Sequence, residues 1–165
     1  MRQKSKPVGK VDKKTKALAK DLLDTIRAQK DPEGVGLAAV QIGKPVRMFA
    51  MLWKKDFRII INPEIIKIGR KQIKRKKAHA KTILEGCLSI PNIYGPLARS
   101  QSLTLKFTDL EGKENVEKFE GFSAQIIQHE VDHLNGILFV DKSLKQKAPL
   151  YKYDASKGNC EEVDL

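Results

Sequence analysis

The residues of this chain best suited to chemistry lie in one short stretch, where residues 128–133 read QHEVDH. His129 and His133 are four positions apart, so on a helix they share a face and can bind one metal ion. Glu130 follows the first histidine, and its carboxylate can act as a general base toward water at that metal. The pattern uses two of only three histidines in the chain. It therefore favours a metal-dependent hydrolase over two histidines on a solvated helix face.

A catalytic metal site of this kind needs a third protein ligand and an open position. No histidine follows His133; the acids that follow it are Asp141, Asp154, Glu161, Glu162 and Asp164. Cys87, in the segment EGCLS at 85–89, is the better candidate, since metal coordination deprotonates a thiol. A lone cysteine is more often a small buried hydrophobe, but the histidine pair favours a ligand here.

A third segment, GVGLAAVQ at 34–41, has small residues that let the backbone pass close to a substrate or to a packed helix. It is not a phosphate-binding or dinucleotide-binding loop, because neither GK[ST] nor a third glycine follows. Gln41 brings an amide that can donate a hydrogen bond. Taken alone, a glutamine at this position is more typical of a turn cap or a surface residue.

The surrounding sequence predicts the elements that position these residues. Apolar residues recur every four positions between residues 12 and 30, which predicts a helix that ends at the DPEG turn. Strands are expected at 46–53 and 57–61, and a hairpin is expected from 103–107 to a strand that ends at Phe119. Residues 64–84 are expected to form a strand pair that is connected by a basic run.

A second helix, from Phe122 to about Leu134, carries HExxH, and Gly136 stands where a helix end favours glycine. The tail from Lys142 onward is polar and weakly patterned, and its proline and glycine argue against one long helix. The order of elements predicts a single α+β domain. In it, antiparallel strands surround a buried central helix that carries HExxH, with a further helix at the N-terminus.

The composition limits the class of protein further. A length of 165 residues suits one domain, and two cysteines exclude a disulfide framework. The longest apolar run, residues 48–53, is far shorter than a membrane span. Residues 1–20 carry +7 and residues 67–81 carry +8, so the remainder sums to −3 against a total of +12. Such basic segments indicate either a polyanionic partner or a solvated surface.

Together, the segments GVGLAAVQ, EGCLS and QHEVDH resemble the three motifs of the peptide deformylase family, in the family's order and spacing. The resemblance extends from about residue 15 to residue 142. It implies hydrolysis of the N-formyl group from the initiator methionine of nascent polypeptides, with release of formate. It also implies one metal ion, usually Fe(II), for which Zn, Ni or Co can substitute.

The same resemblance implies a division of the chain. Residues 1–14 would be a basic extension, for which disorder is one expectation, residues 15–142 the catalytic domain, and residues 143–165 a polar tail. Two differences from the family stand out. Val40 occupies a position that is commonly proline, which loosens the backbone preference at Ala39. A lysine-rich segment also replaces a PDPxLR-like stretch before the first helix.

The resemblance also assigns roles residue by residue. The metal ligands would be Cys87, His129 and His133, and Glu130 would be the catalytic acid and base. The oxyanion would be stabilised by the side chain of Gln41 and the backbone N–H of Leu88. The substrate would contact the backbone of Gly36 and a methionine pocket formed by Val35, Ile83, Phe122, Ile126 and the aliphatic part of Gln125. Arg99 is expected to be structural.

Two alternatives stay open. One is a small metallopeptidase with HExxH and an acidic third ligand. The other is a non-enzymatic basic protein that associates with RNA or the ribosome, although such a protein has no need of Glu130 beside a metal. For a deformylase, segments 1–20 and 67–81 are expected to hold the enzyme near ribosomal RNA. The protein is expected to be a cytoplasmic monomer without a membrane partner.

Overall fold

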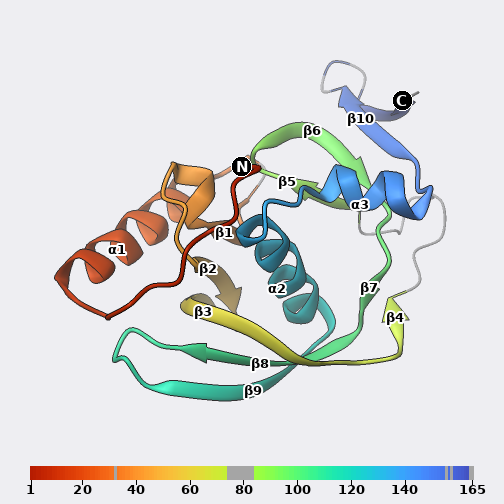
Figure 1. Ribbon diagram of the computed structural model, residues 1–165. Coiled ribbons are helices and arrows are strands. Elements are labelled where there is room, and N and C mark those ends of the chain that lie inside the picture. The colour runs from red at the N-terminus through yellow and green to blue at the C-terminus, as the bar shows by residue number, and fades with distance from the viewer. Residues whose placement is uncertain (32, 74–83, 155, 157, 164–165) are drawn as a thin grey trace.

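The structure is a computed structural model, and it describes residues 1–31, 33–73, 84–154, 156 and 158–163. In this part of the chain, antiparallel strands surround helix α2, Gly121–Leu134, most of whose residues are buried (Figure 1). The α+β class, the antiparallel strands and the buried central helix predicted from the sequence are therefore confirmed.

The largest sheet has five strands in the order β1-β2-β3-β8-β9. They are β1 (Gly36–Ala38), β2 (Met48–Trp53), β3 (Asp56–Ile68), β8 (Ser102–Thr108) and β9 (Glu114–Glu120). Alternation sets the faces of these strands. In β2, Phe49 and Met51 belong to one core cluster, whereas Met48 and Ala50 belong to another. The sheet is thus buried on both faces along its central strands.

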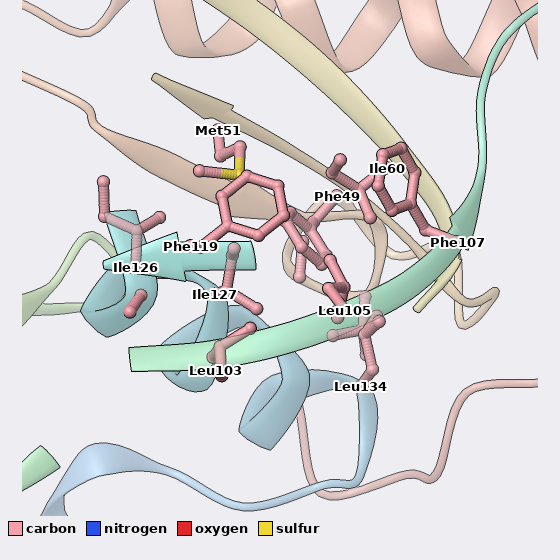
Figure 2. Packing of buried hydrophobic residues seen from close by; sticks show 13 residues of the cluster. Phe49, Met51, Ile60, Leu103, Leu105, Phe107, Phe119, Ile126, Ile127 and Leu134 are labelled. Atoms are coloured by element: carbon pink, nitrogen blue, oxygen red, sulfur yellow. The ribbon is translucent and has the colours of Figure 1, made fainter. Parts of the chain in front are cut away.

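Each face of this sheet packs against one helix. On one face, apolar side chains of α2 such as Ile127 and Leu134 meet Phe49, Phe107 and Phe119 (Figure 2). The other face packs against helix α1, Lys13–Ala28, which buries Ala19, Leu22 and Ile26. Asp12 caps α1 by accepting a hydrogen bond from the Thr15 N–H at 2.8 Å. The apolar stripe predicted between residues 12 and 30 is therefore confirmed.

A second sheet has the strand order β11-β10-β6-β5. Its strands are β5 (Glu85–Cys87), β6 (Ile90–Gly95), β10 (Leu150–Asp154) and β11 (Asn159–Val163). Helix α3, Phe139–Gln146, contributes Phe139 to a core cluster that also contains Cys87, Leu97 and Leu150. This sheet and α3 therefore support the segment that carries Cys87.

Two parts of the structure differ from the expectations. No hairpin within residues 64–84 is seen among the described residues, because β3 continues to Ile68 and pairs with β8, and β4 (Gln72–Ile73) pairs with β7 (Arg99–Ser100). Most of the basic run, residues 74–83, lies outside the described residues. The weakly patterned tail contains most of α3 and the hairpin of β10 and β11, neither of which was predicted.

The N-terminal segment is bound to the domain. The N–H of Ser5 donates to the carbonyl of Leu134 at 2.9 Å, and Lys6 forms an isolated parallel bridge with Val46. The structure thus gives contacts with the domain to part of the segment 1–14, for which disorder was one expectation. At the end of α2, Gly136 has a φ of +75°, and a Cβ there would lie 2.4 Å from the carbonyl oxygen of Arg2. Glycine is therefore required at the predicted helix end.

None of the helices within the described ranges is long and apolar enough to cross a membrane.

Candidate active site

Three side chains from two elements bring their donor atoms together. Cys87 comes from the end of β5, and His129 and His133 lie one turn apart on α2. The Cys87 Sγ lies 3.2 Å from His133 Nε2, which lies 2.9 Å from His129 Nε2. All three donor atoms lie within 4.8 Å of one another. One thiol and two imidazoles are a donor set that fits a divalent transition metal.

The orientation of His129 is fixed by a buried carboxylate. Glu85 Oε1 lies 2.8 Å from His129 Nδ1, so the carboxylate accepts that proton and leaves Nε2 free to face the other two donors. Burial disfavours the charged form of Glu85, but hydrogen bonds from His129 and Arg99 outweigh it and lower its pKa to about 2. Burial also lowers the pKa of His133 to about 3, which keeps that imidazole neutral and able to bind a metal.

Glu130 is buried beside the candidate metal group. Its side chain lines the same cavity as Cys87, and Oε2 has no hydrogen-bond partner among the described residues. Burial raises the pKa of Glu130 to about 7. A carboxylate with such a pKa is suited to accept and return a proton near neutral pH.

Gly36 explains how strand β1 comes so close to this carboxylate. A Cβ at position 36 would lie 2.3 Å from Glu130 Oε1 and 3.0 Å from Ile126 Cγ2. Of the two explanations for the glycines in GVGLAAVQ, close approach to a packed helix therefore holds at this position. A larger residue would displace either β1 or the carboxylate.

Gln41 lies in a short 3₁₀ helix, η1 (Ala39–Ile42), and uses its amide in two directions. Its Oε1 accepts a hydrogen bond from the Ala38 N–H at 2.7 Å, and its Nε2 donates to Ser89 Oγ at 3.0 Å. The same Nε2 lies 3.8 Å from Cys87 Sγ. The turn-cap role considered from the sequence is therefore present, and it also points the amide N–H toward the candidate metal group.

One cavity of about 310 Å³ brings most of the predicted site residues together. Its lining includes Val35, Gly36, Gln41, Cys87, Leu88, Phe122, Gln125, Ile126, His129 and Glu130. Phe122 is 47% exposed, so it lies at the rim. Ile83, which was also assigned to the methionine pocket, lies outside the described residues. The strands β1 and β5, each at the edge of its sheet, border this cavity.

Sequence reasoning missed the residues behind the histidines. Glu85 and Asp132 stand inside the segments EGCLS and QHEVDH, yet neither was given a role. Both are buried and bind Arg99, whose NH2 donates to Glu85 Oε1 at 2.6 Å and whose NH1 donates to Asp132 Oδ2 at 2.5 Å. The structural role predicted for Arg99 fits these contacts. The signal in the sequence was one acidic residue in each motif near a candidate ligand, two positions before Cys87 and one position before His133.

Comparison with known proteins decides the family. The profile of the polypeptide deformylase family matches residues 1–149. The chain belongs to the peptide deformylase family. A peptide deformylase of Mesorhizobium japonicum is 42% identical over 153 residues, which cover 89% of this chain and 80% of that protein. One of Thermomicrobium roseum is 41% identical over 170 residues, which cover 98% of this chain and 90% of that protein.

Solved structures agree with this membership. The crystal structure of the peptide deformylase of Thermotoga maritima matches with a TM-score of 0.74 and 35% identity, covering 86% of this chain and 88% of that one. A peptide deformylase of Legionella pneumophila matches with a TM-score of 0.72 and 39% identity, covering 86% and 78%. The resemblance drawn from the three motifs is thus confirmed, and with it an activity of the family's kind, removal of the N-formyl group from nascent polypeptides.

Proposed function

We propose that this chain removes the N-formyl group from the initiator methionine of nascent polypeptides with Cys87, His129 and His133 holding one Fe(II) ion. One observation carries the proposal. In a member of the deformylase family, the three donor atoms lie within 4.8 Å of one another, and Cys87 and His129 line one cavity with Glu130, whose Oε2 has no hydrogen-bond partner among the described residues. When bound, a divalent metal ion lowers the pKa of water at the site toward neutrality and polarises the substrate carbonyl.

Glu130 acts as the proton carrier in this proposal. It accepts a proton as water attacks the formyl carbon, and it returns that proton to the amine that leaves. Its pKa of about 7 supports both halves of this task, because the group gains and loses a proton with little driving force either way. Its burial keeps bulk water from competing for the proton.

The oxyanion that develops on the formyl group needs donors that are already oriented. We assign these to the Nε2 of Gln41 and the backbone N–H of Leu88, two residues that line the cavity together with Cys87. The bond from Ala38 N–H to Gln41 Oε1 holds the amide, so Gln41 does not depend on proline at position 40 for its orientation. Val40 is instead buried in the main core cluster.

The methionine side chain binds in the apolar part of the cavity. Val35, Phe122 and Ile126 line it, and we keep Ile83 in this assignment from the family resemblance. The backbone of Gly36, at the edge of the sheet, is available for the peptide backbone of the substrate.

The test is formate release from formyl-Met-Ala-Ser by protein loaded anaerobically with Fe(II). The wild-type chain is expected to release formate, and Glu130→Gln is expected to reduce kcat by about 10²–10⁴-fold without loss of metal. Absence of formate release by fully loaded wild-type protein would refute the proposed function. Metal content after purification, with Zn, Ni and Co measured beside iron, tests which ion the site holds.

Cys87→Ala separates this proposal from a metallopeptidase with an acidic third ligand. Among the described residues, the candidate metal group contains Cys87 and no carboxylate, so the variant is expected to lose its metal. Full metal occupancy in Cys87→Ala would favour the acidic ligand. Of the acids considered for that role, Asp164 lies outside the described residues, and Asp141 caps α3 by accepting from the Leu138 N–H.

The basic segments support a second part of the proposal, that the enzyme works as a cytoplasmic monomer held near ribosomal RNA. Segments 1–20 and 67–81 carry the excess positive charge, and their attraction to phosphate should weaken with salt. In co-sedimentation with ribosomes, charge reversal in 67–81 is expected to reduce binding at low salt. Reversal of Lys145 and Lys147 serves as the control. If the variant reversed in 67–81 binds ribosomes as well as the control variant does, residues 67–81 are a solvated surface and do not contact the ribosome.

A further inference from the structure

A chain of polar contacts connects the surface of α3 to the candidate metal group. Lys142 Nζ lies 3.1 Å from Asp132 Oδ1, and the other oxygen of Asp132 accepts from Arg99 NH1 at 2.5 Å. Arg99 donates to both oxygens of Glu85, from Nε at 3.0 Å and from NH2 at 2.6 Å. Glu85 in turn holds the Nδ1 of His129 at 2.8 Å. Lys142 is thus the outer end of a continuous path to a metal ligand.

Lys142 adds a positive charge to a path that contains two buried carboxylates. Glu85 and Asp132 supply two negative charges, and Arg99 alone supplies one positive charge to offset them. The side chains of Glu85 and Arg99 are each 4% exposed, and that of Asp132 is 11% exposed. A buried carboxylate without a full set of donors is costly. Lys142 therefore supplies a positive charge to the Asp132 end of this buried cluster, where Arg99 is the other cation.

Arg99 transmits the position of Asp132 to Glu85 because its guanidinium is a rigid planar fork. Its Nε and NH2, on one edge, bind Glu85, and NH1 donates to Asp132. If Asp132 turned toward other donors, the fork would rotate with it and move the Glu85 carboxylate. That carboxylate sets both the proton position and the ring orientation of His129.

We propose that Lys142 is a positioning residue for the metal site, which acts through Asp132, Arg99 and Glu85 to hold His129. The proposal rests on the assignment of His129 as a metal ligand. It gives α3 a second part in the site, beside the packing of Phe139 in the cluster that contains Cys87. Lys142 itself touches no reacting group.

The test compares Lys142→Met, which keeps the length and removes the charge, with Lys142→Arg, which restores the charge. Lys145→Met, an exposed lysine on the same helix, is the matched control. Co(II) is the probe, and its affinity and visible absorption spectrum are measured for the full-length chain. Lys142→Met is expected to bind Co(II) about tenfold more weakly than the control and to show an altered spectrum. In the formate assay it should lower kcat with an unchanged KM, and Lys142→Arg should restore all three.

The proposal is overturned if Lys142→Met matches Lys145→Met in Co(II) affinity and spectrum, or if Lys142→Arg fails to restore them. If Lys142→Met does not fold, Lys142→Gln is measured in its place under the same criteria. The Co(II) measurements need no turnover. A wild-type chain that bound Co(II) yet released no formate would refute the proposed function and leave this comparison intact.

Discussion

Replacement of Gly36 by alanine should damage catalysis more than stability. The new Cβ would lie 2.3 Å from Glu130 Oε1, whereas ordinary contact begins near 3.4 Å, so the carboxylate must move by about 1 Å. A displacement of about 1 Å at a reacting group can cost on the order of 10²-fold in rate. Overpacking against Ile126, 3.0 Å away, should cost about 1–3 kcal/mol of unfolding free energy.

The assay measures kcat and KM for formate release beside a denaturant unfolding curve. Gly34→Ala is the matched control, because its Cβ would lie 2.9 Å from Ile26 Cγ1, a side chain of the core, and would not meet Glu130. We expect Gly36→Ala to lose about 10²-fold in kcat, with KM little changed, and Gly34→Ala to lose stability only. A folded Gly36→Ala with full kcat, or an equal loss of kcat in Gly34→Ala, would refute the reasoning.

Three further predictions address the buried cluster, a surface pair and the metal. Arg99→Leu leaves Glu85 and Asp132 buried without their shared donor and should lower the unfolding free energy by about 3–5 kcal/mol; an unchanged denaturation midpoint would contradict this. Hydrogen bonds from Arg58 lower the pKa of Glu117, so this pair stabilises the fold above the ordinary carboxyl pKa of 4.5 and loses that contribution as the pH falls. Unfolding curves between neutral and acidic pH should therefore converge for wild type and Glu117→Gln as acid is added, and parallel curves would count against the pair. Protein loaded with Fe(II) beside the Cys87 thiolate should lose activity in air, while protein loaded with Zn should not; equal losses would show that the thiolate–iron pair is not the sensitive element.

The parts of the fold that could be predicted are those whose own sequence carries the signal. Leu22 and Ile26 repeat at helical spacing, and Leu103, Leu105 and Phe107 alternate as a half-buried strand requires. The approach of His129 to His133 could be predicted for the same reason, since HExxH places both histidines on one face through the pitch of one helix. Such local patterns need no knowledge of the neighbours.

The remaining parts depend on distant partners. β10 and β11 are short and polar, and they form because β10 pairs with β6 and Leu150 joins the cluster around Cys87. The sequence of residues 150–163 alone does not indicate that β6 is the pairing strand. The sequence around Glu85 does not distinguish it from a surface acid. Its buried role depends on Arg99, which binds it from another strand. A buried carboxylate can be told from an exposed one only by its counter-ion, and here that counter-ion is 14 positions away in the sequence.

The attachment of the N-terminal segment to the end of α2 has a consequence for the order in which the chain acquires its structure. Ser5 bonds to Leu134, and Arg2 pairs with Asp141, a residue 139 positions later. A ribosome makes the N-terminal residues first. Lys6 can pair with Val46 early, but Leu134 and Asp141, the partners of Ser5 and Arg2, are made much later. Contacts at this sequence separation form slowly, because a long loop must close first. The contacts of Ser5 and Arg2 can therefore form only after helix α2 and the start of α3 have been made, later than the bridge from Lys6 to Val46.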